Sequence, residues 1–575
     1  MSGASTAEAV NGNASPGEGL ANEESKVVNL VWDKDSKPKP EKQVRKPATK
    51  SGAFKVNSLG VFYGEDKDRV RICSPLRVLA LTRDEGSNDW GRLLEFEDPD
   101  GQIRRWTMPA SMLKGDGSDY RGILLSQGFD IAGKSSHEKL SEYIRSQNPT
   151  ERVTCVNKTG WYQGSFVLPD RTIGSGANEI TFHQASYAAP IHLKQRGSVE
   201  EWKELIGRYC TGQHRLIYMI SAAISAPLLE IIGADSSGVH YVGGSSVGKS
   251  TGIKLATSFF ASPDYNLTWN STSNGLEADA ASRCDLPLVL DEIGQADGST
   301  VGAAIYTLCN GKGRGRADRN GDGRKAKALR NRILSSGEVE VGSHIESAGK
   351  TSRAGHTVRL VNIQANAGKG LGILNFVPEG FSSASNFIDY LSAQSKEVYG
   401  APGLAFIERI ASDRTELASR INTGMEAWIK IHLPIGSTEQ VSRVASQFAF
   451  TAVSGEIATR YGFTDWDSGE SFEAAADAFQ SWLTQRGTGE PEEEGQAVQK
   501  IKSFIEANQF GRIVAWLRDD ADPRIVHNCV GYKDLDSNRF LLTAGGFKEA
   551  INGLNITAVC DVLARKGFVS KRRGR

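Results

Sequence analysis

The sequence is poor in cysteine and carries no excess of charge. Its 575 residues contain seven cysteines, and 68 Lys and Arg balance 68 Asp and Glu. The cysteines are scattered, with no CxxC pair and no histidine at ligand spacing, which argues against a zinc module or a disulfide framework. Because the net charge is zero, any surface that binds a polyanion must be a local patch. The cysteines are Cys73, Cys155, Cys210, Cys284, Cys309, Cys529 and Cys560.

The sequence also lacks an apolar segment long enough for an ordinary membrane span. The run LIYMISAAISAPLLEII, residues 216–232, is short and contains Pro227 and Glu230. We expect a buried helix with a break there. The start MSGASTAEAVNGNASPGEG lacks the charged end and apolar core of a signal peptide. These features predict a cytoplasmic protein with no membrane segment.

What is present is a chain of several parts, as its length and its changing hydrophobic periodicity indicate. Short strand patterns with the turn signal DPDG come first, alternating strand and helix patterns follow, and helical patterns come after those. We predict an α/β core with a parallel five-stranded sheet, preceded by a mostly β domain. The predicted parts are a disordered tail (1–50), a mostly β N-terminal domain (51–198), the core (199–370), a helical domain (371–486), an acidic linker (487–497) and a winged-helix domain (498–575).

A glycine-rich stretch, VHYVGGSSVGKST, joins a strand pattern to a helix pattern. Gly243, four further residues, and then Gly248, Lys249 and Ser250 match the P-loop pattern. Such glycines let backbone N–H groups close around phosphates, while the lysine reaches the β- and γ-phosphates and the serine holds Mg²⁺. The stretch therefore predicts binding of ATP and Mg²⁺. The predicted nucleotide-binding residues are Gly243, Gly244, Ser245, Ser246, Val247, Gly248, Lys249, Ser250 and Thr251.

A buried strand pattern, LPLVLDEIG, ends in two acidic residues. We expect Asp291 to bind Mg²⁺ together with Ser250, and Glu292 to activate the attacking water. An ordinary solvated strand end is the alternative. The glutamate next to the aspartate favours an NTPase that hydrolyses by water attack over a kinase.

Three further strand patterns, residues 266–273, 332–338 and 356–363, complete a set of five. Their chain order is that of AAA+ and superfamily 3 helicase cores, in which the fourth strand ends in a polar residue that senses the γ-phosphate. Ser335 or Ser336 is expected to have this role, and we take Ser336 as the catalytic candidate. A simple turn at the strand end is the alternative.

Arg353 lies just before the last strand pattern, where this class places an arginine finger that reaches a neighbouring subunit. Arg359 is the weaker choice, because it falls within that strand pattern. Arg443, which opens a later helix pattern, is a further candidate for a nucleotide sensor. An active site shared between subunits implies a homo-oligomeric ring, most simply a hexamer.

The chain resembles the helicase-like ATPase family of prophages, plasmids and integrative cassettes, which has a domain of unknown function. The resemblance implies an AAA+ type ATPase that unwinds or translocates single-stranded or forked DNA in replication of the element, with replication proteins as possible partners. That family includes inactivated derivatives, but Lys249, Ser250, Asp291 and Glu292 are all present, which favours an intact ATPase. The matching stretches, which cover most of residues 60–487, are GWYQGSFVLPDRTIG, SAAISAPLLEIIG, SGVHYVGGSSVGKST, LTWNSTSNGLEADAA, LPLVLDEIGQAD, YTLCNGKGRGR, ILSSGE and RAGHTVRLVNI.

A basic stretch, NGKGRGRADRNGDGRKAKALRNR, lies between the acidic strand and the fourth strand. Its turn-forming centre RNGDG and the basic residues on both sides favour a hairpin that follows a phosphate backbone. A solvated surface loop is the alternative. The terminal KGFVSKRRGR is a second basic patch. The candidate nucleic-acid-binding residues are Lys312, Arg314, Arg316, Arg319, Arg324, Lys325 and Lys327.

Two other functions stay open from the sequence. An ATP-gated module that recognises an origin or recruits a replisome, without unwinding DNA, would use the N-terminal and winged-helix domains. A remodeller of proteins would need aromatic residues in its hairpin, and the basic stretch has none.

Overall fold

The structure is a computed structural model of the 575-residue chain. The predicted tail, residues 1–50, lies outside the described residues, as do most of the centre of the basic stretch and the end of the chain. The described residues are 54–65, 68–177, 179–182, 193–313, 316–317, 323–324, 328–486, 492–516 and 527–569.

The N-terminal part is mostly β, as predicted. Its strands form a sheet β1-β2-β3, a mixed sheet β11-β7-β4-β5-β6 and a small sheet β10-β9-β8, with the helices α1 and α2 between β6 and β7. The DPDG turn joins β5 to β6, and Asp98 closes it by accepting hydrogen bonds from the backbone N–H groups of Asp100 and Gln102. The elements are β1 Lys55–Asn57, β2 Gly60–Tyr63, β3 Val70–Cys73, β4 Arg77–Arg83, β5 Gly91–Glu97, β6 Ile103–Pro109, η2 Ala110–Leu113, α1 Ser118–Ser126, α2 Ser136–Ser146, β7 Arg152–Val156, β8 Gly160–Tyr162, β9 Ser165–Val167, β10 Thr172–Ile173 and β11 Ile180–Phe182.

The central sheet has five parallel strands in the spatial order β13-β14-β19-β12-β20, which confirms the predicted parallel sheet. The strand before the glycine-rich loop, β12, is separated from the acidic strand, β14, by β19. Because all five strands are parallel, their carboxyl ends meet at one edge of the sheet. The strands are β12 Ser237–Val242, β13 Leu267–Thr268, β14 Pro287–Asp291, β19 Arg332–Gly337 and β20 Leu360–Gln364.

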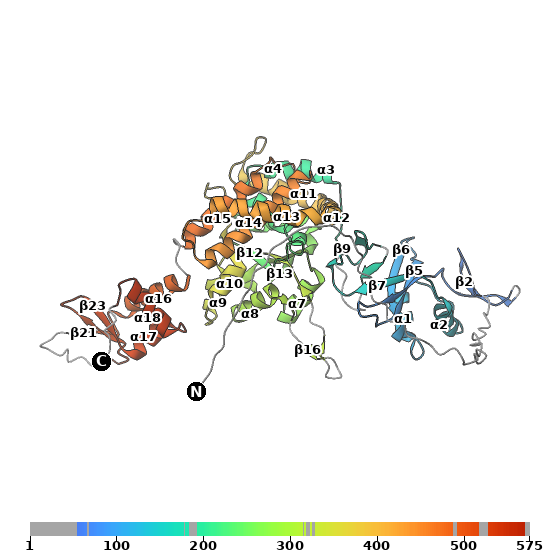
Figure 1. The fold of residues 1–575 in the computed structure, drawn as a ribbon, viewed down its shortest axis with the longest axis horizontal. Helices are drawn as coiled ribbons and strands as arrows, with labels where there is room; N and C mark the ends of the chain where they lie inside the picture. The colour runs from blue at the N-terminus through green and yellow to red at the C-terminus, as the bar shows by residue number, and fades with distance from the viewer. Residues whose placement is uncertain are drawn as a thin grey trace, which may run out of the picture. The chain divides into compact units, whose positions relative to one another are not determined.

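Each face of this sheet has its own hydrophobic core, because successive side chains of a strand point to opposite faces. Val289 and Leu334 belong to one buried cluster, with helices α5, α6 and α14. Leu288 and Ile333 belong to the other, with α7, α8 and α9. Figure 1 shows these helix groups on either side of the sheet. The helices are α5 His214–Ile224, α6 Lys249–Ser258, α7 Ser273–Ser282, α8 Gly298–Cys309, α9 Val341–Ser347 and α14 Glu439–Arg460, with the 3-10 turns η5 Pro263–Tyr265 and η6 Ile293–Gln295.

Two predicted strands have different bounds in the structure. The strand predicted at 266–273 is only β13, because Thr272 instead caps α7 by accepting from Gly275 N at 3.1 Å. The strand predicted at 356–363 starts at Leu360. Arg359 therefore ends helix α10, Ala354–Arg359, and does not lie within the strand.

The apolar run 216–232 is a buried helix with a break, as predicted. Helix α5 ends at Ile224, and Pro227 lies in the following 3-10 turn, η4, Ala226–Leu228. Among the described residues, no helix has the length and apolarity that crossing a membrane requires.

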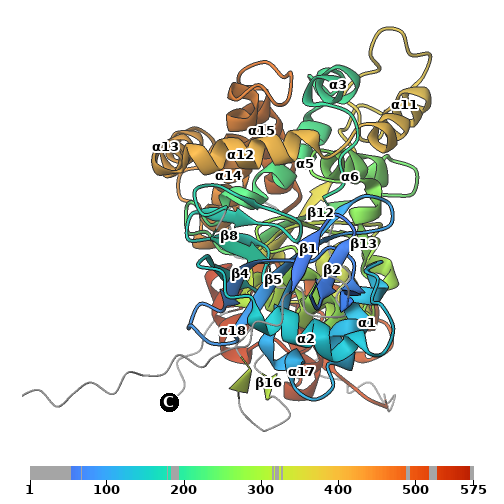
Figure 2. The ribbon, with the colours of Figure 1, turned by 90° about the vertical axis from the view of Figure 1, so that its right-hand side faces the viewer.

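Five further helices confirm the predicted helical region after the core, and Figures 1 and 2 show them grouped beyond one side of β12. Two of them, α14 and α15, pack on α5, and the rings of Tyr218 of α5 and Phe448 of α14 stack with centroids 5.2 Å apart. These helices are α11 Ala384–Glu397, α12 Ala401–Ser412, α13 Arg414–His432, α14 and α15 Glu470–Arg486. Another helical stretch precedes α5 in the chain and is made of α3 Val199–Trp202, η3 Lys203–Gly207 and α4 Arg208–Cys210.

The small strands β8 and β9 pack into the hydrophobic core that surrounds α5. Trp161 and Phe166 belong to the same buried cluster as Ile220 of α5, although the predicted domain boundary at residue 198 lies between them. The Trp161 backbone N–H donates to Asp285 Oδ2 at 2.8 Å, and its indole N–H donates to Pro227 O at 2.7 Å. Trp161 thus fixes the N-terminal part to the residues that precede β14.

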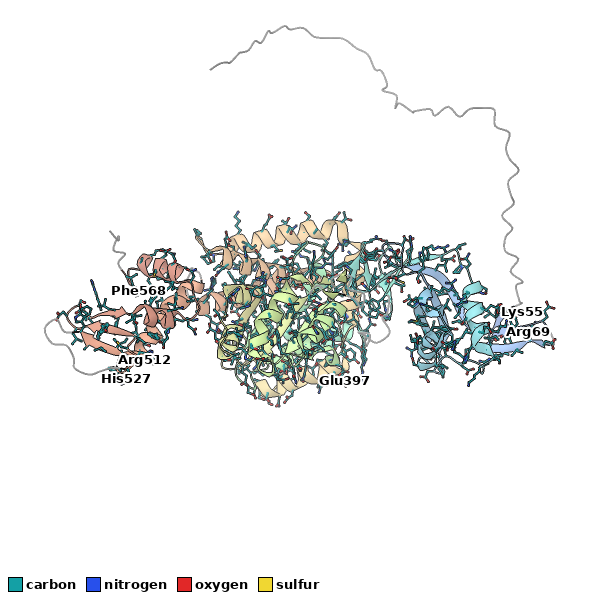
Figure 3. The ribbon with its side chains drawn as sticks, turned by 90° about the horizontal axis from the view of Figure 1, so that it is seen from below. Lys55, Arg69, Glu397, Arg512, His527 and Phe568 are labelled. Atoms are coloured by element: carbon teal, nitrogen blue, oxygen red, sulfur yellow. The ribbon has the colours of Figure 1, made fainter. Side chains whose placement is uncertain are left out.

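The described residues of the C-terminal part, 492–516 and 527–569, form three helices and a three-stranded sheet. Strand β21 pairs parallel with β22, β22 pairs antiparallel with β23, and two helices follow this hairpin. Arg512 and Glu549 form an ion pair at 2.7 Å within it, and Figure 3 labels Arg512 there. The first helix begins inside the predicted linker, as expected of a glutamate-rich helix start. The elements are α16 Glu492–Asn508, β21 Ile513–Trp516, β22 Gly531–Asp534, β23 Arg539–Leu542, α17 Ala544–Ile551 and α18 Ile556–Arg565.

Candidate active site

The glycine-rich loop connects the carboxyl end of β12 to helix α6. Gly248 has φ 97°, and a Cβ there would lie 2.7 Å from Ile373 Cγ2, so the position needs glycine. Lys249 is buried, and its Nζ donates to Gly243 O and Gly244 O, each at 2.7 Å. The side chain is therefore folded over its own loop at the helix N-terminus.

The residues of this loop suit a bound polyphosphate and Mg²⁺. The first turn of a helix offers backbone N–H groups that lack partners within the helix. Gly244 faces open space, and Ser245 and Ser250 are exposed. Hydroxyl and carboxylate oxygens are the ligands that Mg²⁺ takes in such sites. Thr251, the last predicted residue of the loop, lies in the first turn of α6 and is partly exposed.

Asp291, Glu292 and Ser336 come together at the same edge of the sheet. The hydroxyl of Ser336 donates to Asp291 Oδ1 and accepts from the backbone N–H of Glu292 at 3.2 Å. Gly243 N donates to Gly337 O at 3.2 Å, which ties the glycine-rich loop to the end of β19. The structure thus brings the loop, the acidic pair and the candidate sensor serine into one place.

Glu292 has φ 58°, in the left-handed region that a side chain other than glycine adopts at a cost. Ser246 of the glycine-rich loop has φ 63°. Both residues lie at the predicted site, one in each of its two loops. Strain of this kind concentrates where a structure must hold a side chain in a set position.

Behind the acidic pair lies a buried hydrogen-bond chain that sequence reasoning missed. His240 Nε2 lies 3.0 Å from Val339 O, so it must donate there, and Nδ1 then accepts from the Ser335 hydroxyl at 2.8 Å. The Trp269 indole N–H donates to Ser335 Oγ at 2.8 Å, and the Trp269 backbone N–H donates to Asp291 O at 3.1 Å. Ser335 is therefore occupied in the core, which leaves Ser336 to face the site.

This chain requires a neutral imidazole. His240 is fully buried, and burial lowers its pKa to about 4. The nearby His344 and Lys249 lower the pKa further, while the bond to Val339 O opposes them. In the sequence, a histidine within the apolar strand SGVHYV is the signal that could have indicated a buried polar network.

Among the described residues, no hydrogen bond or ion pair joins the candidate arginines to this cluster. Arg353 is exposed at the N-cap of α10, and no ion pair in the described part of the chain includes it. Arg359 is engaged, because it donates to Gly355 O at 3.1 Å and its guanidinium lies 4.9 Å from the Tyr306 ring centroid. Arg443 lies with Ser237 around a pocket at the amino end of β12, the end opposite the glycine-rich loop.

The basic stretch forms paired strands, as a hairpin requires. Strand β15, Gly311–Lys312, pairs antiparallel with β18, Ala328–Leu329, and β16, Arg316–Ala317, pairs antiparallel with β17, Gly323–Arg324. Figure 1 marks β16 beyond α7 and α8. In this register Arg316 lies opposite Arg324, and the Lys312 side chain is exposed. The candidates Arg314, Arg319, Lys325 and Lys327 and the predicted turn lie outside the described residues.

Comparisons with known proteins agree with this architecture. Residues 50–328 match the family described as "Domain of unknown function (DUF927)". No curated protein matches the chain. A solved structure titled "SCCmec type IV Cch - active helicase" is 19% identical, with a TM-score of 0.66, and the match covers 91% of this chain and 95% of that one. At this identity the likeness shows a shared fold.

Proposed function

We propose that the chain is a Mg²⁺-dependent ATPase that works as a ring, most simply a hexamer, and translocates along or unwinds DNA in replication of a mobile element. One observation carries the proposal. The glycine-rich loop, the Asp291–Glu292 pair and Ser336 meet at the carboxyl edge of one parallel sheet. This is the donor set that phosphoanhydride hydrolysis by water requires.

Each side chain has a task that its position suits. Lys249, now held by two loop carbonyls, would exchange them for phosphate oxygens. Ser250 and Asp291 would hold Mg²⁺, which neutralises phosphate charge when it is bound. Glu292 would accept a proton from the attacking water. Ser336, which already touches both acidic residues, would orient them and contact the γ-phosphate.

DNA is the proposed substrate for movement. The paired strands of the basic stretch place Arg316 and Arg324 at opposite positions in the register, and a phosphate backbone following the hairpin would offset the positive charge of the stretch. The fold shared with a protein whose title is "active helicase" supports the same substrate class. The C-terminal part, in the role of the predicted winged helix, would add a duplex contact. Exposed Arg353 would complete the nucleotide site of the next subunit.

The test is ATP hydrolysis by the purified full chain, with and without single-stranded or forked DNA, followed by strand displacement. Lys249→Ala and Glu292→Gln should each lower kcat by about 100-fold or more. Lys430→Ala and Glu426→Gln change an exposed lysine and an exposed glutamate of α13, and serve as matched controls. An inactive wild-type chain under all conditions would contradict the ATPase proposal.

A further inference from the structure

A pocket of about 590 Å³ lies at the amino end of β12, at the opposite edge of the sheet from the glycine-rich loop. Its wall includes Ser236 and Ser237, which lead into β12, and Cys309 and Asn310, the last residues before the paired strands of the basic hairpin. Ser236 joins the two, since its hydroxyl donates to Leu329 O of β18 at 2.6 Å. The pocket therefore borders the base of the hairpin.

Arg332, the first residue of β19, lies directly behind this pocket with no exposed surface. Its Nη1 donates to Ser237 Oγ and, at 3.5 Å, to Gln447 Oε1, and both of these residues line the pocket. Its Nη2 donates to Thr451 Oγ1 at 2.9 Å. Within the described ranges, its Nε has no hydrogen-bond partner.

Arg332 is thus a buried cation whose partners are all neutral. Burial lowers its pKa, and the groups that oppose this are Tyr218, Tyr241 and Cys309 rather than a carboxylate. Taking a guanidinium out of water is strongly unfavourable when no anion accompanies it. A negative charge placed in the pocket would lie just across Ser237 and Gln447 from this guanidinium.

The rim of the pocket adds more positive charge than negative charge. Arg359 and Arg443 line it, against one lining carboxylate, Asp235, which is exposed. Arg443 reaches Glu439 only at 3.7 Å, and both side chains are mostly exposed, so that pair is weak. Arg359 is held in place by its contact with Tyr306.

We propose that this pocket binds a phosphate group, contacted by Arg359 and Arg443 and attracted by the buried charge of Arg332. The volume exceeds that of one phosphate and leaves room for an attached sugar. The phosphate can come from a DNA strand lying on the adjacent hairpin or from a free phosphate compound. Only the first source rests on the proposed function.

The experiment measures binding to the full chain in a Lys249→Ala background, which removes the main phosphate ligand of the glycine-rich loop. Inorganic phosphate is titrated against the Tm at constant ionic strength, and a labelled oligothymidylate is titrated by fluorescence anisotropy. Ser446→Glu places a carboxylate in the pocket from the middle of α14, and Ser446→Gln is the neutral control of similar size. Arg443→Gln removes one proposed contact.

Phosphate should raise the Tm by a few degrees when its concentration is about 100 times its dissociation constant. Ser446→Glu should weaken phosphate binding by about tenfold relative to Ser446→Gln. Arg443→Gln should weaken it by about tenfold relative to the Lys249→Ala chain alone. Parallel loss of oligothymidylate binding identifies the DNA backbone as the source, and unchanged oligothymidylate binding identifies a free phosphate compound. ATP hydrolysis is not measured, so failure of the ATPase proposal would not affect the result.

Three outcomes would overturn the proposal. The first is a Tm that does not respond to phosphate in the Lys249→Ala chain. The second is equal phosphate affinity in Ser446→Glu and Ser446→Gln. The third is loss of oligothymidylate binding alone, because that would mean that the new carboxylate repels DNA from outside the pocket.

Discussion

Two adjacent serines at the end of β19 have different surroundings. The Ser335 hydroxyl lies in the core between His240 and Trp269, whereas the Ser336 hydroxyl lies between Asp291 and the backbone of Glu292. Successive residues of a strand point to opposite faces, so one strand end serves both the core and the site. The two positions should therefore respond differently to the same substitution.

Ser335→Ala should lower the free energy of unfolding by about 2–4 kcal/mol, because it leaves the Trp269 indole N–H and His240 Nδ1 buried without partners. Ser336→Ala should cost about 1 kcal/mol or less, since Asp291 and Glu292 are partly exposed, so the Asp291 carboxylate and the Glu292 backbone N–H can bond to water instead. It should instead lower kcat about tenfold. Urea denaturation and steady-state ATPase assays on both variants check this, and equal stability of the two would contradict it.

His240 gives the fold a specific dependence on pH. Its pKa is about 4 in the folded chain against the ordinary 6.5, so only the unfolded chain takes up the proton between these values. The neutral imidazole makes its full contribution to the free energy of unfolding above pH 6.5. As the pH falls toward 4 this contribution decreases, and at pH 5 the free energy of unfolding is lower by about 2 kcal/mol.

The variant His240→Gln keeps a donor for Val339 O but does not titrate. The loss of Tm from pH 7 to pH 5 should therefore be smaller in His240→Gln than in the wild type. Calorimetry or dichroism at both pH values measures the difference. Equal losses would mean that the imidazole is already protonated in the fold.

At the scale of elements, the strand β19 connects the basic hairpin to the candidate active site. The hairpin arm β18 precedes it at one end, and Ser336 lies at the other. A six-residue strand that is paired on both sides is stiff. A movement of the hairpin would therefore shift the whole strand and move Ser336 relative to the acidic pair, while the sheet stays folded. This gives a physical route by which DNA could stimulate hydrolysis.

Replacing Arg319, Arg324 and Lys325 by Ala should reduce the stimulation of ATPase activity by DNA while basal activity is retained. If each contacts a phosphate, the slope of log affinity against log salt should fall by about 2. Measurement of ATPase activity against oligonucleotide concentration at several salt concentrations checks both effects. The triple replacement of the exposed Lys369, Lys396 and Lys430 is the control. Unchanged DNA dependence would leave the stretch as a solvated loop.

The parallel sheet and the hairpin pairing followed from local patterns in the sequence. The apolar pattern LPLVLD is a short-range signal, and the structure has the strand β14 there. The short strands on either side of the RNGDG segment pair, while the predicted turn itself stays a prediction. The strand predicted at 266–273 failed because Thr272 prefers to cap a helix. The His240 chain and the buried Arg332 depend on strands that meet only in the folded sheet, so no spacing could indicate them.

At the scale of the whole molecule, Arg353 is the residue that can test whether the chain works as a monomer or as the proposed ring. Its exposed position at the N-cap of α10 suits a contact with another subunit. If the site is shared, a subunit with a damaged Lys249 can still lend its Arg353 to a neighbour.

Mixing Arg353→Ala chains with Lys249→Ala chains in equal amounts should therefore restore activity. In randomly mixed rings, about one site in four has both an intact Lys249 and a neighbour's Arg353, so about a quarter of wild-type ATPase activity is expected. Each variant alone should be nearly inactive. A mixture no more active than the two parents would place Arg353 outside the active site.

The packing of Trp161 also determines where a stable fragment of the chain can begin. Trp161 and Phe166 fill the core that surrounds α5, and Trp161 binds the carboxylate of Asp285, which Arg330 also holds. A fragment that starts at residue 199 would lose both aromatic rings and expose the apolar surface beneath them. A fragment that keeps this core should accordingly begin before Thr159, and gel filtration should show it monodisperse where the fragment that starts at residue 199 aggregates.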